Sequence, residues 1–406
     1  MAHRRRTHLR IGDHAVHRVQ PMELFFDLVF VFAVTQLSHY LLEHRSLAGA
    51  LQTTAMFLAV WWAWMYTAWA TNWLDPERAP VRLVLAAVML GSLVLAATMK
   101  EAFGKYGLAF ALAYCAIQIG RTFYTAWARG EWRRGESKNL TRAGLYFVAS
   151  SPLWVAGGLD PDPMWRLLWW AAGLAIEYAG PLLFFALPGL GRSKVEEWQI
   201  SGEHMAERCA LFIIISLGEG ILVTGATFAG LDKALPAMVA FACAFVSTVA
   251  MWWIYFDVGA RRGSEVIEHS DRPGLLGRQA YTYAHIPIVG GIIVLAVGDE
   301  IVLTHPSGHS DPAFLMILTG GAFLFVGGSG LFKRLTNANK WFPLSHLVGL
   351  GLFGLLAVWG WLVHPEPLLL ALLASALFVI IAVWEWGSFH GGWAERLGWL
   401  RNGRPD

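Results

Sequence analysis

The stretch PMELFFDLVFVFAVTQLSHY, residues 21–40, decides the fold because it combines apolar sequence of membrane-spanning length with ionisable side chains. An α-helix needs about twenty apolar residues to cross the hydrocarbon core of a bilayer. The run contains Glu23 and Asp27 and has no small-residue cleavage site at its end. We therefore expect a retained first span, with a polar stripe on an apolar rod, and not a removed signal peptide.

The composition of the whole chain is typical of a membrane protein. Hydrophobic residues make up 56% of the 406 residues and charged residues only 15%, whereas a soluble domain carries roughly 25% charged residues. The net charge of +2 gives no reason to expect nucleic acid as a partner. The expected partner is the lipid bilayer. No metal site or cofactor is predicted, since Cys115, Cys209 and Cys243 have no metal-binding spacing.

Further apolar runs of similar length follow, separated by Gly, Pro and charged clusters such as DPERAP (75–80) and GGLDPDP (157–163). The expected spans are residues 23–43, 49–70, 81–99, 107–127, 143–159, 165–187, 206–228, 234–257, 279–303, 313–332, 342–363 and 366–387. We predict an all-α polytopic membrane protein with about twelve transmembrane helices.

The distribution of Lys and Arg predicts the orientation. If the N-terminus is cytoplasmic, the inside loops and tails hold 24 of these residues, the outside loops hold five, and two lie within spans. Lys and Arg are enriched in cytoplasmic loops of membrane proteins. The split predicts that both termini are cytoplasmic and that the chain is a multi-pass protein of the cell membrane.

Sequence landmarks recur in the same order in the two halves of the chain. The pairs are Glu23 with Glu207, Trp61–Trp62 with Trp252–Trp253, and GSLVLAA (91–97) with GGIIVLA (290–296). We predict two parallel six-helix repeats, because an even number of spans gives both copies the same orientation. The predicted organisation is a basic cytoplasmic N-tail (1–22), a first half (23–190), a linker (191–205), a second half (206–388) and a C-tail (389–406).

Three stretches carry a family resemblance. PMELFFDLVFVFAVTQLSH (21–39) resembles the opening signature of the bacterial low-temperature-requirement protein A (LtrA) family, and AERCALFIIISLGEGIL (206–222) and VGDE (297–300) are similar to its later signatures. The resemblance runs over essentially the whole chain and implies a polytopic membrane protein. It supplies no catalytic or binding residues, because the family name records a growth phenotype.

Ionisable side chains within spans are the candidate functional residues, since each costs about 2.5–3.5 kcal/mol on insertion scales. Glu23 and Asp27 lie four residues apart on one helix face. Gln36 and His39 follow within roughly one side of the same helix. For Glu23 the alternative is a helix cap, because a carboxylate is favourable at a helix N-terminus.

Glu219 is predicted to be the stronger candidate for proton exchange. It follows Glu207, itself a candidate, by twelve residues or about 18 Å, which puts it near the bilayer centre. Without a cationic or hydrogen-bonding partner it could exchange protons near neutral pH. His285 is a further candidate, although a lone histidine is more often a hydrogen-bonded core residue.

Other polar and aromatic groups have structural alternatives. Glu177 and Arg121 lie near mid-depth and are expected to form a structural ion pair. Asp299 and Glu300 close the ninth span, either as an outer mouth for a cation or as a solvated loop end. The aromatic run WWAWMYTAWATNW (61–73) is expected to form an interfacial belt and packing surface, with a stacking wall for a flat or cationic substrate as the alternative.

These features predict a proton- or cation-coupled secondary transporter of a small solute, without catalytic residues. The alternative is a membrane-embedded enzyme or lipid-handling protein whose carboxylates and histidines do acid–base work, which would require them to cluster at one interface. No phosphate loop, nucleophile elbow or metalloprotease motif occurs. A channel is less expected, since nothing resembles a selectivity filter, and a homo-oligomer stays open.

Overall fold

The structure, a computed structural model, describes residues 8–10, 19–130, 135–194, 197, 198, 200–257, 266, 270, 273–337 and 341–389. Within these residues the chain is helical, with two isolated bridges and no strand. Twelve of the described helices have 20 residues or more, and each overlaps one predicted span. Most of the predicted N-tail, and the predicted C-tail after residue 389, lie outside the described residues.

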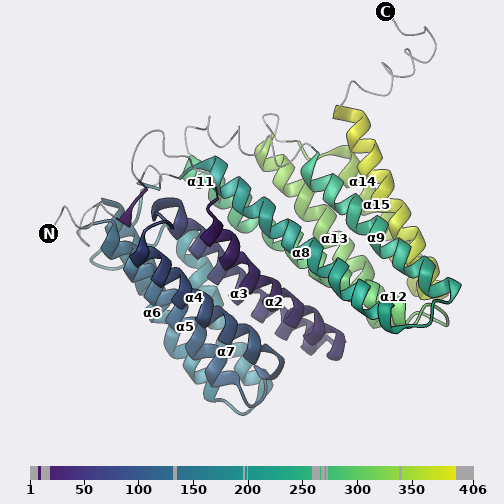
Figure 1. Cartoon of the computed structure of the whole chain (residues 1–406), viewed down its shortest axis with the longest axis horizontal. Coiled ribbons are helices and arrows are strands. Elements are labelled where there is room, and N and C mark those ends of the chain that lie inside the picture. The colour runs from purple at the N-terminus through teal and green to yellow at the C-terminus, as the bar shows by residue number, and fades with distance from the viewer. Residues whose placement is uncertain are drawn as a thin grey trace, which may run out of the picture. The chain divides into compact units, whose positions relative to one another are not determined.

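Figure 1 labels the long helices. The first six are α2 (Pro21–Glu43), α3 (Leu47–Trp73), α4 (Ala79–Thr98), α5 (Gly107–Ala128), α6 (Gly135–Leu159) and α7 (Pro163–Leu182). The other six are α8 (Gly202–Gly230), α9 (Leu235–Phe256), α12 (His285–Thr304), α13 (Pro312–Thr336), α14 (Leu344–Val363) and α15 (Pro367–Phe389). Three short segments are η2 (Met99–Glu101), α11 (Pro273–Gly277) and η4 (Arg278–Tyr283), the last a π-helix.

Local sequence explains where several helices begin. Proline occupies one of the first two positions of α2, α4, α7, α9 and α13, where its missing N–H leaves no intrahelical bond unmade. Ser46, Asp162 and Asp311 cap α3, α7 and α13 by accepting a hydrogen bond from a first-turn backbone N–H. The breaks predicted at 75–80 and 157–163 therefore fall where α4 and α7 begin.

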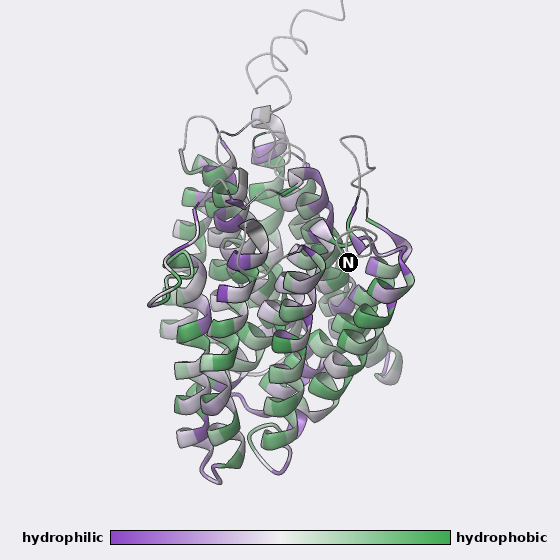
Figure 2. Ribbon diagram, turned by 90° about the vertical axis from the view of Figure 1, so that its left-hand side faces the viewer, coloured by the Kyte–Doolittle hydropathy of each residue, from purple (hydrophilic) through white to green (hydrophobic). Residues whose placement is uncertain are grey.

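Eight helices in the described part of the chain are long and apolar enough to cross a membrane, namely α2, α4, α8, α9, α12, α13, α14 and α15. The other four, α3, α5, α6 and α7, have sufficient length but are less apolar in composition than these eight. Apolar positions run along the helices, and many hydrophilic positions lie at helix ends and in connections (Figure 2). The chain has the helices of a multi-pass membrane protein, and the count of twelve crossings stays a prediction.

The chain divides into two compact units. The first unit comprises residues 1–215 and 267–286, and the second comprises residues 216–266 and 287–406. One border falls inside α8, whereas the sequence places the border between its halves at the linker 191–205. Compactness and duplication are different criteria, so the predicted six-helix repeats stay a prediction.

Within the first unit, α2 packs against α3 and α4, α3 packs against α5 and α7, and α5 lies between α4 and α6. Within the second unit, α9 packs against α15, and α14 packs against both α13 and α15.

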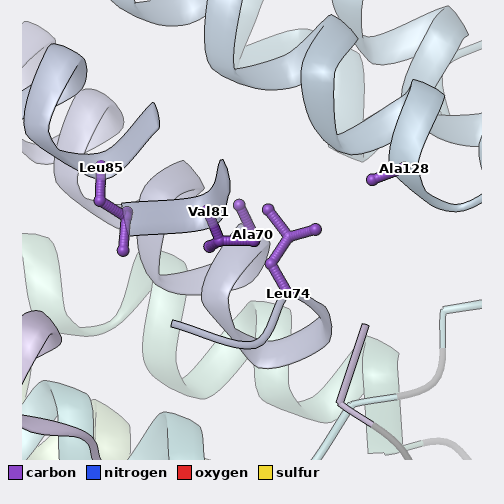
Figure 3. Packing of buried hydrophobic residues seen from close by; sticks show 5 residues of the cluster. All are labelled: Ala70, Leu74, Val81, Leu85 and Ala128. Carbon is purple, nitrogen blue, oxygen red and sulfur yellow. The ribbon is translucent and has the colours of Figure 1, made fainter. Parts of the chain in front are cut away.

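An apolar cluster of the first unit anchors the segment that precedes α2. Its buried members, shown in Figure 3, are Ala70, Leu74, Val81, Leu85 and Ala128 from α3, α4, α5 and the α3–α4 turn. Leu9 and Met22 pack against this cluster. The chain at residues 8–10 also pairs with residues 73–75 through backbone hydrogen bonds. These contacts hold Arg10 beside the first turn of α2.

The tryptophans of the aromatic run 61–73 form part of the core of the first unit. Trp61, Trp62 and Trp64 are fully buried. Their predicted counterparts in the second unit, Trp252 and Trp253, are 45% and 40% exposed. The two tryptophan pairs therefore lie in different environments, and the first of them serves packing between helices.

Candidate functional site

Glu23 and Asp27 lie on the first two turns of α2, and both side chains are fully buried. Glu23 completes a capping box with Gln20, whose backbone N–H donates to Glu23 Oε2 over 2.9 Å. The capping role expected as an alternative for Glu23 is therefore present. It accounts for only part of the bonding of this carboxylate.

Glu23 also binds two cationic or protonatable side chains. Its Oε1 lies 2.8 Å from His204 Nε2 on α8, and its Oε2 lies 3.0 Å from Arg10 Nη2. The Asn72 amide nitrogen lies 3.2 Å from His204 Nδ1. An amide N–H can only donate, so this network assigns the imidazole proton to Nε2, which donates to Glu23. The Glu23 carboxylate thus has hydrogen-bond donors on both oxygens.

Asp27 is bonded on one oxygen only. Its Oδ1 accepts from Arg208 Nη2 and from Trp64 Nε1, both over 2.8 Å. Its Oδ2 is buried and has no hydrogen-bond partner among the described residues. A buried carboxylate oxygen without a donor is costly as an anion. Asp27 is therefore the carboxyl group of this cluster that can take up a proton with the least loss of hydrogen bonding.

Arg208 connects the two carboxyl-bearing turns of α2 to α8. Its Nη2 binds Asp27, and its Nη1 donates to the backbone carbonyl of Glu23 over 3.0 Å. The side chain is fully buried, and its guanidinium lies over the rings of Phe26 and Trp64. A buried guanidinium needs such a partner set, since an isolated buried charge is strongly unfavourable.

Glu207 lies one turn from His204 on α8 and is partly buried. Its Oε2 accepts a hydrogen bond of 2.9 Å from the backbone N–H of Val19, in the segment that enters α2. The structure thus brings three of the predicted candidates, Glu23, Asp27 and Glu207, to the contact between α2 and the start of α8. We call Glu23, Asp27, His204 and Arg208 the α2–α8 cluster.

Gln36 and His39 lie farther along α2 and do not join this cluster. They follow Asp27 by nine and twelve residues, about 13 and 18 Å along the helix axis. Both are partly buried. Neither side chain forms a hydrogen bond or ion pair within the part of the chain that the structure describes.

Glu177 and Arg121 are connected indirectly. Glu177 accepts hydrogen bonds from Tyr114, Ser150 and Trp154, over 2.5, 2.6 and 2.9 Å. Gln118 donates to the Tyr114 hydroxyl over 2.9 Å and accepts from Arg121 through its own oxygen. Glu177 and Arg121, both described, are therefore linked by hydrogen bonds through Tyr114 and Gln118 and form no direct ion pair.

The remaining candidates are distributed over both units. His285 is fully buried in the first unit, where its Nδ1 lies 2.8 Å from the Ala280 carbonyl oxygen. Glu219 is buried in the part of α8 that belongs to the second unit. Asp299 and Glu300 lie partly buried within α12, before its end at Thr304, and not in the loop beyond it.

Sequence reasoning did not assign several members of the site. Arg208 is one of only two cations within predicted spans, and this was the signal that could have paired it with an acidic residue of another span. Arg10 and His204 fell in segments predicted to be a tail and a linker, and nothing local marks Asn72 as a partner of His204. These pairings join residues 13 to 181 positions apart in the chain.

Comparison with known proteins gives a family and one relative. Residues 18–383 match the family described as bacterial low temperature requirement A protein (LtrA). Over 369 residues the chain is 38% identical to an uncharacterised protein of Rhizobium meliloti, an alignment that covers 90% of this chain and 88% of the relative. No solved structure matches. The matched range contains Glu23, Asp27, His204 and Arg208.

Proposed function

The chain belongs to the bacterial low temperature requirement A family, and from that premise we propose that it is a proton-coupled secondary transporter of a small solute. Secondary transporters place coupling groups on membrane helices, buried among side chains that can change partners. The observation that carries the proposal is Asp27, a fully buried carboxyl group with one unpaired oxygen beside Arg208.

The proposed topology has twelve crossings in the cell membrane, with both termini cytoplasmic and the two halves as parallel repeats. Its support is the alternation of Lys and Arg between the connecting segments. The four less apolar helices fit this topology, because each has 20 residues or more and so measures about 30 Å, the thickness of a bilayer core.

In the proposed cycle, Asp27 binds and releases the coupling proton. Ionised Asp27 attracts Arg208 by charge, so that α2 and the start of α8 are held together. Protonation removes that attraction and leaves Arg208 bound to the Glu23 carbonyl. The contact between the two helices is then weaker, and the proton shifts the balance between two arrangements of α2 and α8.

Asp27→Asn tests the proposal. The purified protein is reconstituted in liposomes with a pH-sensitive dye inside, and a panel of organic anions, cations and neutral solutes is imposed as outward gradients. We expect at least one solute to drive proton movement through the unaltered protein and none to do so through Asp27→Asn. The control is Glu43→Gln, because Glu43 forms an exposed ion pair with Lys100.

A second measurement needs no solute. Infrared titration in deuterated buffer reports protonated carboxyl groups through their C=O stretch. We expect Asp27→Asn to remove a band that Glu43→Gln leaves in place. Proton movement that survives in Asp27→Asn, together with an unchanged carboxyl band, would refute the role of Asp27.

Glu219 is a second proposed coupling group, because it is a buried carboxyl group in the part of α8 that belongs to the second unit. Glu219→Gln is expected to reduce the proton movement. Unchanged movement would restrict the coupling role to Asp27. Further polar groups proposed for the solute or proton path are Gln36, His39 and His285. The proposed role of Glu207 is to hold the segment that precedes α2 through its hydrogen bond with Val19.

The membrane-embedded enzyme remains the second candidate, because Glu23 and His204 form a carboxylate–imidazole pair near one end of α2. General acid–base catalysis requires such a pair to reach a substrate. Both side chains are fully buried, and this disfavours an active site at the pair. His204→Gln discriminates between the two functions, since an enzyme would lose turnover of its substrate while a transporter would retain solute-driven proton movement.

A further inference from the structure

A cavity in the first unit lies apart from the α2–α8 cluster, none of whose members lines it. The cavity is partly open to the outside. Its walls come from α3, α5, α6, the end of α7, the segment that follows α7, α11 and η4, all within the first unit. Seven of its 17 described lining residues are aromatic, among them Trp62, Tyr66, Trp69, Trp73, Phe184 and Trp198.

Two guanidinium groups line this cavity. Arg121 donates to the Ala63 carbonyl over 3.0 Å and to the Thr67 hydroxyl over 3.2 Å, and its other main partner is the neutral Gln118. Arg278 donates to the Pro181 carbonyl. Among the described lining residues none is acidic, and neither arginine forms an ion pair with a described residue. The described hydrogen-bond partners of both guanidinium groups are therefore neutral.

Two N–H donors of the lining residues have no acceptor. The Trp62 side chain, including its indole N–H, is fully buried, and the Nε–H of Arg278 is buried as well. Neither atom has a hydrogen-bond partner among the described residues. A buried donor left unpaired is unfavourable. An acceptor that reached these N–H groups would satisfy them.

Tyr66 lies in the electrostatic field of both arginines. Arg121 sits 5.4 Å from the centre of its ring. The acidic group that also acts on Tyr66 is Glu177, but its oxygens are taken by Tyr114, Ser150 and Trp154 on other walls of the unit.

An aromatic wall by itself often indicates a cation site. Here the ring faces of Tyr66 and Phe184 are already covered by guanidinium groups, at 5.4 and 4.9 Å from the ring centres. These guanidinium groups would repel a further cation, whereas they would donate charge-assisted hydrogen bonds to an anion. Trp69 and Trp198 are only partly buried, so they offer aromatic surface against which a flat apolar body can pack.

We propose that this cavity binds an organic anion with a flat apolar body, of the aromatic carboxylate class. The carboxylate lies between Arg121 and Arg278, and the ring lies against Trp69 and Trp198. The further claim that this anion is the transported solute rests on the proposed transport function. Binding itself needs no transport, so the two are tested separately.

The test is isothermal titration calorimetry of the full chain in detergent micelles, with empty micelles as background. The probes are 1-naphthoate, the neutral 1-naphthamide and the cation 1-naphthylmethylammonium, which share one ring system. We expect 1-naphthoate to bind roughly ten- to a hundredfold more tightly than the amide, as for a hydrogen bond to a charged group, and the cation not to bind. Equal affinity for carboxylate and amide would overturn the proposal.

Three variants locate the site. Arg278→Gln should abolish the preference for the carboxylate, and Arg278→Lys should restore part of it. Trp62→Phe keeps an aromatic ring but removes the unpaired indole N–H, and should weaken 1-naphthoate binding several-fold. Arg78→Gln is the matched control, since Arg78 forms an exposed ion pair with Asp75 and does not line the cavity. A preference that persists in Arg278→Gln, with unfolding temperature unchanged, would refute the site.

Transport of the same probe separates the two proposals. Selective binding of 1-naphthoate, with no solute of the panel driving proton movement, supports the cavity and overturns the transport function. Proton movement driven only by solutes that are not anions supports the transport function and overturns the solute class.

Discussion

The two units differ in how they bury charge. The first unit buries Glu23, Asp27, Arg121, Arg142, Arg166, Glu177 and Arg208, most of them in networks with several polar partners. The second unit buries Lys333 against Glu385, with Glu219 on its part of α8. Lys333 also donates to the Ile254 carbonyl over 2.6 Å. The first unit is therefore built around polar interactions to a much greater extent than the second.

The concave surfaces of the two units differ in the same way. The cavity of the first unit has two arginines on its wall. A groove of the second unit, between α9 and α15, is lined by apolar residues and tryptophan alone, among them Phe245, Trp253 and Trp386. Such a surface suits lipid tails. Buried charged groups in polar networks are therefore concentrated in the first unit.

The largest expected difference concerns the two buried ion pairs. Replacing Arg208 and Asp27 together, by Arg208→Met with Asp27→Leu, should reduce solute-driven proton movement to background. Lys333→Met with Glu385→Leu should leave it largely intact, because apolar replacement of a buried ion pair is often neutral or stabilising by about 1–4 kcal/mol. Proteoliposome assays of both double variants measure this. Equal losses in the two would erase the functional distinction between the units.

The next effect is on stability. Glu177→Leu leaves the donors of Tyr114 and Trp154 unpaired, whereas Ser150 can still donate to the Phe147 carbonyl. At about 1–3 kcal/mol for each unpaired donor, the variant should lose about 2 kcal/mol or more. In the second unit, Ser375→Ala removes a hydrogen bond of 2.8 Å to Ser247 and should lose about 1 kcal/mol. Unfolding in detergent, followed by tryptophan fluorescence, compares them. A larger loss for Ser375→Ala would contradict the polar core of the first unit.

A smaller effect tests the tryptophan landmarks. Trp64→Phe removes one of the two donors to Asp27 Oδ1 and should lower stability by about 2 kcal/mol. Trp253→Phe changes a 40% exposed side chain and should lower it by less than about 0.5 kcal/mol. The same unfolding assay serves both variants. Similar losses would indicate equivalent environments, as a strict repeat requires.

The smallest effect is a pH dependence in the loop that follows α7. Partial burial raises the pKa of Glu197, but hydrogen bonds from the Lys194 backbone N–H and from Asn139 outweigh this and hold that pKa below its usual range. Because the pKa is lower in the folded state, the stabilisation is present at neutral pH and is lost as the pH falls through the folded value.

Glu197→Gln should therefore unfold at a slightly lower temperature than the unaltered protein at pH 7. The difference should disappear in acid. Unfolding temperatures measured across the acid range for both proteins check this. A difference that grows toward low pH would have the wrong sign.

The sequence by itself determined the helices and the polar face of α2. Apolar run length and the positions of Gly and Pro are local properties, so each predicted span coincides with one long helix. The four-residue spacing placed Glu23 and Asp27 on one face, because helical geometry depends only on position along the chain. The choice of Glu219 over Asp27 as the stronger candidate used the same local information, namely estimated depth.

Only the tertiary structure decided the partners of these groups. The pairing of Asp27 with Arg208 spans 181 positions, and the cavity joins Arg121 on α5 to Arg278 on η4. Such contacts depend on the rotation and packing of whole helices against one another, which hydropathy does not encode. For the same reason the unpaired oxygen of Asp27 and the unpaired N–H of Trp62 have no counterpart in the sequence pattern.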